Sequence, residues 1–155
     1  MSAIKHRPIR LRGRQKRGLR TQFGALCYRI RQDKVQILLV TSRTRGRWIA
    51  PKGWPVPGAT PAETALQEAW EEAGVEGKIK GDCLGIYTYT KQREDGDLPC
   101  VVALFAVKVK RLHADYPESH QRKRKWFSRK KAAAAVDNPE LAQLIRSFAP
   151  RKAKS

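Results

Sequence analysis

The segment from Thr60 to Gly74 constrains the fold more than any other, because both ends of a helix are marked in it. Thr60 is a good N-cap residue, Pro61 occupies the first helical position, and Glu63 completes a capping box. Gly74 supplies the stop. Apolar residues recur between them at helical spacing, at Ala62, Ala65, Leu66, Ala69 and Ala73. The sequence therefore predicts an amphipathic helix over residues 60–73.

The face of this helix opposite the alanines carries three carboxylates. At about 100° per residue, Glu71 and Glu72 lie at about −60° and +40° from Glu68, so all three share one side. The 25 residues from 53 to 77 contain five glutamates and no lysine or arginine. A plain solvated face tolerates such a cluster, because each like-charge pair costs only about 0.2–0.5 kcal/mol. A divalent cation held by carboxylate oxygens relieves the same repulsion, so the cluster is also a candidate metal site.

The rest of the chain predicts one α+β domain, since 155 residues is the length of a single domain. Apolar and β-branched runs between turn signals indicate strands at residues 21–30, 34–41, 47–50, 78–90, 99–109 and 125–127. The first two are expected to pair antiparallel and the last to be an edge strand. A second amphipathic helix is expected over 139–148. Because these elements do not alternate as βαβ units, a mixed-sheet sandwich fits better than a doubly wound fold.

Basic residues outnumber acidic ones by 33 to 14, which gives a net charge of +19. This excess indicates a polyanionic partner, whether nucleic acid, nucleotide, polyphosphate or membrane surface. Residues 1–20 carry eight lysines or arginines and no acid, which predicts a disordered basic tail. A second such tail is expected at 149–155, with the folded domain at 21–148 between them. The tails are the segments through which we would expect nucleic acid to bind.

Two further features exclude classes of protein. The longest uncharged apolar stretch, Leu98 to Val107, has about half the length of a membrane-spanning helix, so no membrane span is predicted. The three cysteines, Cys27, Cys83 and Cys100, are scattered and lack Cys-x-x-Cys spacing, which argues against a disulfide scaffold and a zinc site. They suit a reducing compartment, so we expect a cytoplasmic protein. The sequence leaves the oligomeric state open.

One motif in the acidic window resembles a known family signature. Upstream of the helix, Pro51-Lys52-Gly53-Trp54-Pro55 is a rigid turn whose glycine lets a backbone carbonyl approach closely. Gly53 followed at the right distance by Gln67-Glu68-Ala69-Trp70-Glu71-Glu72-Ala73-Gly74-Val75 resembles the Nudix box, Gly-x₅-Glu-x₇-Arg-Glu-U-x-Glu-Glu-x-Gly-U, where U is aliphatic. The flanking Arg47-Trp48-Ile49-Ala50-Pro51 and Lys125-Trp126-Phe127 are also similar to segments of Nudix hydrolases. The similarity spans roughly residues 21–148.

The resemblance implies a Nudix-type α/β/α sandwich with a mixed sheet, and an enzyme that hydrolyses diphosphate linkages with Mg²⁺ or Mn²⁺. Its metal ligands would be the side chains of Glu68, Glu71 and Glu72 and the carbonyl of Gly53, with Glu68 or Glu72 as general base. In the family the box arginine helps to orient the catalytic glutamate. Gln67 stands at that position, so it orients the glutamate by a hydrogen bond alone or not at all.

Two other positions follow from the resemblance. The first box glutamate falls on Ala59, a milder departure, because that glutamate is mostly structural or peripheral in the family. A further acid outside the box often contributes to the site, and Glu94, Asp95 and Asp97 are candidates by position only. Each of these three is explained more readily by a solvated loop charge.

The substrate is expected to be strongly anionic. Thr41-Ser42-Arg43, the following Arg47-Trp48-Ile49 and Trp126-Phe127 after a basic run resemble the branch of diphosphoinositol polyphosphate phosphohydrolases, which also cleaves diadenosine polyphosphates. Candidate phosphate contacts are Arg20, Arg43, Arg45, Lys52 and the basic cluster at 122–125. Taken singly, each is explained more readily by a solvated surface cation.

Two alternatives remain open at this point. The basic tail and the cluster at 122–125 fit a non-catalytic RNA- or ribosome-binding module on a Nudix-like scaffold, whose binding would depend strongly on salt. Such a module has no reason to retain three carboxylates on one helical face. The other alternative is an enzyme that removes oxidised nucleoside triphosphates.

Overall fold

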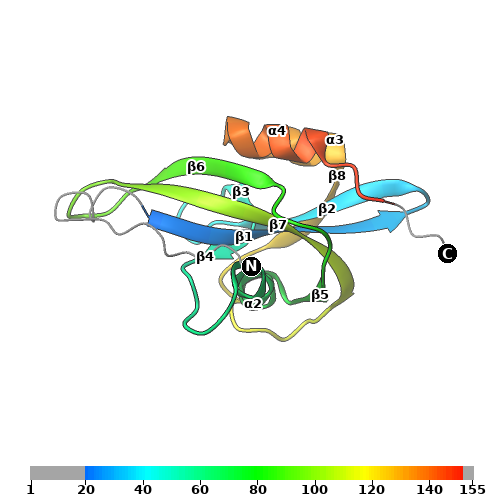
Figure 1. The fold of residues 1–155 in the computed structure, drawn as a ribbon, viewed down its shortest axis with the longest axis horizontal. Coiled ribbons are helices and arrows are strands. Elements are labelled where there is room, and N and C mark those ends of the chain that lie inside the picture. The colour runs from blue at the N-terminus through cyan, green and yellow to red at the C-terminus, as the bar shows by residue number, and fades with distance from the viewer. Residues whose placement is uncertain (1–19, 152–155) are drawn as a thin grey trace.

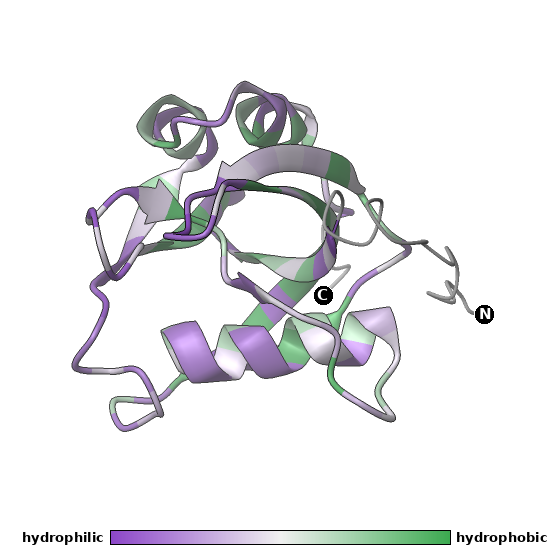
Figure 2. Cartoon of the chain, turned by 90° about the vertical axis from the view of Figure 1, so that its left-hand side faces the viewer, coloured by the Kyte–Doolittle hydropathy of each residue, from purple (hydrophilic) through white to green (hydrophobic). Residues whose placement is uncertain are grey.

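A mixed eight-stranded sheet runs through the fold with helices on both of its faces (Figure 1). The structure is a computed structural model that describes residues 20–151. Figure 2 shows helix α2 (Pro61–Ala73) alone beneath the sheet, with α3 (Arg129–Ala135) and α4 (Pro139–Ser147) above it. The predicted α+β fold, a three-layer sandwich with a mixed sheet, is confirmed.

The sheet is built around one parallel strand pair. Its strands are β1 (Arg20–Arg31), β2 (Lys34–Thr41), β3 (Trp48–Ile49), β4 (Lys52–Gly53), β5 (Val75–Ile79), β6 (Gly85–Lys91), β7 (Leu98–Leu112) and β8 (Arg124–Ser128). The order is β3-β2-β1-β7-β5, and β4, β6 and β8 pair with β1, β7 and β2. Strands β1 and β7 are parallel, and the other pairs are antiparallel.

The predicted hairpin of the first two strands is confirmed, and it places the turn that carries Lys52 and Gly53. Both residues of its tight turn, Gln32 and Asp33, have positive φ, which suits the twist of the strands. The strands pair from the turn as far as Cys27 opposite Leu38. Beyond that point the segment 48–53 lies between them, so that β3 pairs with β2 and β4 with β1. Lys52 and Gly53 are thereby fixed inside the sheet.

Both predicted caps of α2 are confirmed. The backbone N–H of Glu63 donates to Thr60 Oγ1 at 3.1 Å, and the N–H of Thr60 donates to Glu63 Oε1 at 2.9 Å. Gly74 ends the helix in the left-handed region, with φ of 67°. The alanine face is fully buried, at Ala65, Ala69 and Ala73. Because these side chains are small, the helix packs closely on the sheet.

The sheet separates two apolar cores. Phe23, Ala25 and Cys27 of β1 pack with α2, whereas the alternate residues Leu26 and Tyr28 pack with α3 and α4. The second predicted helix is thus confirmed as α4, whose apolar side faces the sheet. No helix within residues 20–151 is long and apolar enough to cross a membrane.

Three expectations differ from the structure. The predicted strand at 78–90 is two strands, β5 and β6, because Gly81 adopts φ of 80° and turns the chain between them. Helix α3, which Ser128 caps at its N-terminus, was not predicted. Arg20, assigned to the basic tail, is the first residue of β1. The other tail positions at 1–19 and 152–155 lie outside the described residues.

Candidate active site

Glu68 and Glu72 lie one turn apart on α2 and form a carboxyl pair against β4. The side chains are hydrogen-bonded to each other, and Glu72 is only 5% exposed. The backbone N–H of Lys52 donates to Glu72 Oε1 at 3.3 Å. A Cβ atom at Gly53 would lie 2.3 Å from Cδ of Glu68, so only glycine leaves room for this carboxylate. The predicted contact between the turn and the acidic helix is therefore present.

Burial raises the pKa values of both carboxyls. Burial, followed by the charge of Glu72 and the hydrogen bond to it, raises the pKa of Glu68 to about 8. Burial also raises the pKa of Glu72, against the opposing effects of Arg122 and Lys52. Closely spaced carboxylate oxygens that are partly removed from water are a donor set that suits a hard divalent cation. The residues therefore fit a hard divalent cation.

Gln67 and Glu71 form a separate pair. Nε2 of Gln67 donates to Oε2 of Glu71 at 2.8 Å on the exposed side of the helix. In this arrangement Gln67 orients Glu71, while Glu72 is held by the backbone of Lys52 and by Arg122. Across residues 20–151, no three His, Cys, Asp or Glu side chains converge as a preformed metal cluster. Of the predicted ligand set, the structure brings Gly53, Glu68 and Glu72 together.

Two residues of the loop between β7 and β8, residues 113–123, complete the carboxyl site. Nε of Arg122 lies 2.7 Å from Oε1 of Glu118, and Nη2 lies 3.6 Å from Oε2 of Glu72. Glu118 raises the pKa values of both helix carboxyls through its charge. Sequence reasoning did not single out Glu118. It grouped Arg122 with neighbouring cations as a phosphate contact, and the spacing of the loop gave no sign that it would fold back onto α2.

The acids predicted outside the box all lie in one loop. Glu94, Asp95 and Asp97 belong to the loop between β6 and β7. Asp95 there forms an exposed ion pair with Arg93, with 3.1 Å between Oδ2 and Nη2. The acid beside the carboxyl pair is Glu118 instead.

A cavity of about 570 Å³ adjoins the carboxyl site through Lys52. Its wall combines cations with aromatic rings and polar groups, and includes Arg45, Arg47, Trp48, Lys52, Tyr87, Tyr89, Lys91, Gln92 and Asn138. The ammonium of Lys52 lies 4.6 Å from the centroid of the Tyr89 ring, and burial lowers its pKa. Nη2 of Arg45 donates to Oε1 of Gln92 at 2.7 Å. Two of the four predicted substrate-binding residues, Arg45 and Lys52, therefore line one cavity.

The other predicted phosphate contacts do not line this cavity. Arg43 donates from Nη1 to Oε1 of Gln121 at 3.2 Å on the surface, and Arg20 lies opposite Cys100 of β7. In the cluster at 122–125, the side chains alternate. Arg122 and Arg124 are half-buried towards α2, whereas Lys123 and Lys125 are exposed. Half of the cluster is therefore committed to contacts inside the protein.

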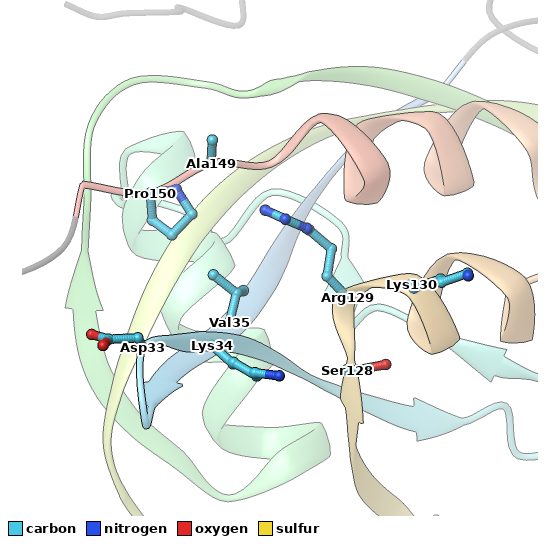
Figure 3. A pocket seen from close by; sticks show the side chains of 8 residues that line it. All are labelled: Asp33, Lys34, Val35, Ser128, Arg129, Lys130, Ala149 and Pro150. Atoms are coloured by element: carbon cyan, nitrogen blue, oxygen red, sulfur yellow. The ribbon is translucent and has the colours of Figure 1, made fainter.

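A second cavity, of about 430 Å³, lies between the tip of the β1–β2 hairpin and the start of α3 (Figure 3). It is lined by Asp33, Lys34, Val35, Ser128, Arg129, Lys130, Ala149 and Pro150. None of the predicted site residues lines it. The larger cavity, which Lys52 links to the carboxyl pair, is therefore the candidate substrate site.

Comparison with known proteins agrees with this geometry. The family model for the NUDIX domain matches residues 20–148. The chain belongs to the Nudix hydrolase family. It is 31% identical over 126 residues to the human diphosphoinositol polyphosphate phosphohydrolase NUDT4B, covering 80% of this chain and 66% of that protein. It is 30% identical over 150 residues to the mitochondrial Nudix hydrolase 13 of Arabidopsis thaliana, covering 85% of this chain and 74% of that protein.

Solved Nudix structures share the fold. The Ap4A hydrolase of C. elegans gives a TM-score of 0.59 at 24% identity, over 83% of this chain and 94% of that one. A NUDIX hydrolase from Nitrosomonas europaea gives 0.60 at 23% identity, over 82% and 86%. The predicted membership of the Nudix family is confirmed, and members of this family generally use divalent metal ions. The chain spans just under two thirds of the human relative.

This Nudix chain departs from the usual box at two positions that the structure now places. Ala59 lies in the turn before α2, where its N–H donates to the carbonyl of Val56 at 3.0 Å. Gln67 bonds Glu71, as described above. Neither departure disturbs the contact between Gly53 and the carboxyl pair.

Proposed function

We propose that this Nudix protein hydrolyses a diphosphate linkage in a highly anionic substrate, with Mg²⁺ or Mn²⁺, by attack of water on phosphorus. The observation that carries the proposal is the position of Lys52. Its backbone holds Glu72 of the carboxyl pair, and its side chain reaches into the cationic cavity. Lys52 thereby connects the candidate metal ligands with the candidate phosphate contacts, and both sets must act on one substrate for a diphosphate to be cleaved.

The residues that would hold the cation are Glu68 and Glu72 with the carbonyl of Gly53, and Glu71 at the exposed rim. When bound, such a cation polarises the phosphate and lowers the pKa of a bound water. Glu72 is buried and held by Lys52 and Arg122. Glu68 is the less restrained of the two carboxyls, and its pKa is closer to neutrality than that of an ordinary glutamate. We therefore assign to Glu68 the acceptance of the proton from the attacking water.

The cavity supports a polyphosphate substrate. Arg45, Arg47, Lys52 and Lys91 would contact phosphate oxygens, since lysine and arginine form the strongest hydrogen bonds to such groups. The relatives' names point to diphosphoinositol polyphosphates. Half-buried aromatic rings on the same wall, such as Tyr89, also suit a nucleobase, as in diadenosine polyphosphates or nucleoside triphosphates. The shared requirement is a diphosphate on an anionic carrier. We further propose the cytoplasm as its compartment, where free thiols persist.

A phosphate-release assay on the purified chain tests the proposal. The substrates are a diphosphoinositol polyphosphate, diadenosine tetraphosphate, and normal and oxidised dGTP, each with Mg²⁺, with Mn²⁺ and with a chelator. We expect cation-dependent turnover of at least one of the first two and little preference for oxidised dGTP. A strong preference for oxidised dGTP would favour nucleotide sanitation. No turnover, combined with salt-sensitive retention on RNA, would favour the RNA-binding module and contradict the proposal.

A further inference from the structure

Arg122 has a partner at every nitrogen of its guanidinium. Nε contacts Glu118 at 2.7 Å, Nη2 contacts Glu72 at 3.6 Å, and Nη1 donates to the backbone carbonyl of Thr41 at 3.0 Å. Its side chain is 8% exposed, and those of Glu72 and Glu118 are 7% and 20% exposed. Each contact is therefore made with little competition from water, which strengthens charge-assisted hydrogen bonds.

The backbone around Arg122 is fixed as well. Lys123 donates to Oγ1 of Thr41 at 2.9 Å and accepts from the N–H of Thr41 at 3.0 Å. The N–H of Glu118 donates to the carbonyl of Glu71 at 3.0 Å, so the loop 113–123 is tied to both β2 and α2 (Figure 1). The guanidinium therefore approaches Glu72 from a rigid support.

The side chain that orients Glu72 is thus the guanidinium of Arg122, from the loop 113–123. Gln67, on the helix itself, bonds Glu71 instead.

We propose that Arg122 is a positioning residue that fixes the carboxylates of Glu72 and Glu118 for cation binding. The inference rests on the proposed function, because it concerns the same carboxyl site. The planar guanidinium of an arginine can contact two carboxylates and a carbonyl at once. The ammonium of a lysine, on its flexible side chain, cannot hold all three in that geometry. Residues that orient ligands in this way typically change metal affinity or activity about 10–100-fold when removed.

Arg124 provides a matched control. It belongs to the same basic cluster and also anchors onto α2, with Nη1 donating to the carbonyl of Ala73 at 2.7 Å. Its guanidinium lies 4.8 Å from the centroid of the Tyr116 ring and is paired with none of the site carboxylates in the described part of the chain. A role limited to anchoring the loop would make the two arginines equivalent.

The experiment compares wild type with Arg122→Gln, Arg122→Lys and Arg124→Gln in the full chain. Mn²⁺ affinity is measured by calorimetry without substrate, kcat and KM are measured on a substrate that wild type cleaves, and thermal unfolding reports stability. For Arg122→Gln we expect Mn²⁺ affinity and kcat to fall about 10–100-fold. KM should change little, Arg122→Lys should recover only part of the loss, and Arg124→Gln should lower Tm alone.

Several results would overturn the proposal. Tighter Mn²⁺ binding by Arg122→Gln, or full recovery in Arg122→Lys, would show that only charge matters. A change confined to KM would make Arg122 a substrate contact, and equal effects in Arg124→Gln would make it a loop anchor. If Arg122→Gln does not fold, Glu118→Gln tests the same contact and should weaken Mn²⁺ binding, whereas unchanged binding would refute the role.

The two proposals fail separately. If wild type cleaves no substrate, the proposed function is wrong, yet the Mn²⁺ dissociation constants of the Arg122 and Arg124 variants still test the positioning role. If wild type cleaves substrate but Arg122→Gln matches it in every quantity, only the positioning role is wrong.

Discussion

The backbone N–H of Lys52 lies 3.3 Å from Oε1 of Glu72, while the ammonium of the same lysine lies 4.6 Å from the centroid of the Tyr89 ring. One residue of β4 therefore joins the acidic helix on one face of the sheet to the cavity on the other.

Replacing Lys52 by methionine should raise KM strongly and leave the fold intact. Methionine keeps the backbone bond to Glu72 and most of the apolar stem, but it removes the charge that faces the cavity. Loss of a charged hydrogen bond is worth about 1.5–3 kcal/mol, so kcat/KM should fall about 10–100-fold. Steady-state kinetics check this, with Lys34→Met in the second cavity as control (Figure 3). Equal effects of both substitutions would contradict the assignment of the substrate cavity.

Gly53→Ala should displace Glu68 and weaken cation binding. The new Cβ would lie 2.3–2.6 Å from the carboxylate atoms of Glu68, which sit at the end of a flexible side chain and can move away. Calorimetry with Mn²⁺ should therefore record weaker binding in a protein that still folds. In the double variant Gly53→Ala/Glu68→Ala the clash is absent. Its change in the free energy of unfolding should therefore differ from the sum of the changes in the two single variants. Additive effects would show that the two residues do not interact.

The cation-free protein should lose stability as pH rises from about 5 to about 8. The pKa of Glu68 is raised from 4.5 to about 8 in the folded state. Between these values the folded state therefore binds more protons than the unfolded state, and the free energy of unfolding falls with pH. Urea unfolding in the presence of a chelator should show this slope, and Glu68→Gln should reduce it. A Glu68→Gln protein with the full wild-type slope would contradict the shift.

Thr60→Ala should destabilise the protein without affecting the chemistry. The substitution leaves the N–H of Glu63 without its acceptor at the N-terminus of α2, which should lower the free energy of unfolding by about 1 kcal/mol. Chemical denaturation measures the loss, and Thr60→Ser should retain most of the stability. A drop in kcat larger than the loss of folded protein would mean that the cap also positions the carboxylates.

Local signals predicted the acidic helix well, because a capping box, a stop glycine and three carboxylates on one side depend only on near neighbours. The contact with Gly53 followed from the resemblance to the Nudix box. Glu118 and Arg122 could not be found in this way, since their contacts require a distant loop to pack on α2. One signal was available: residues 122–125 lead into a strand, so alternate side chains must face inwards. Because all four residues were interpreted as surface cations, this alternation of inward and outward side chains was missed.

The most direct test of the central claim is Mg²⁺-dependent hydrolysis by Glu72→Gln and Glu76→Gln, compared with wild type on the same polyphosphate substrate. Glu72 belongs to the buried carboxyl pair, whereas Glu76 is partnered by His113 and Arg111 on the surface of β5. We predict that Glu72→Gln loses at least about 100-fold in kcat while Glu76→Gln retains wild-type activity. Equal activity of the two variants, with both proteins folded, would contradict the account.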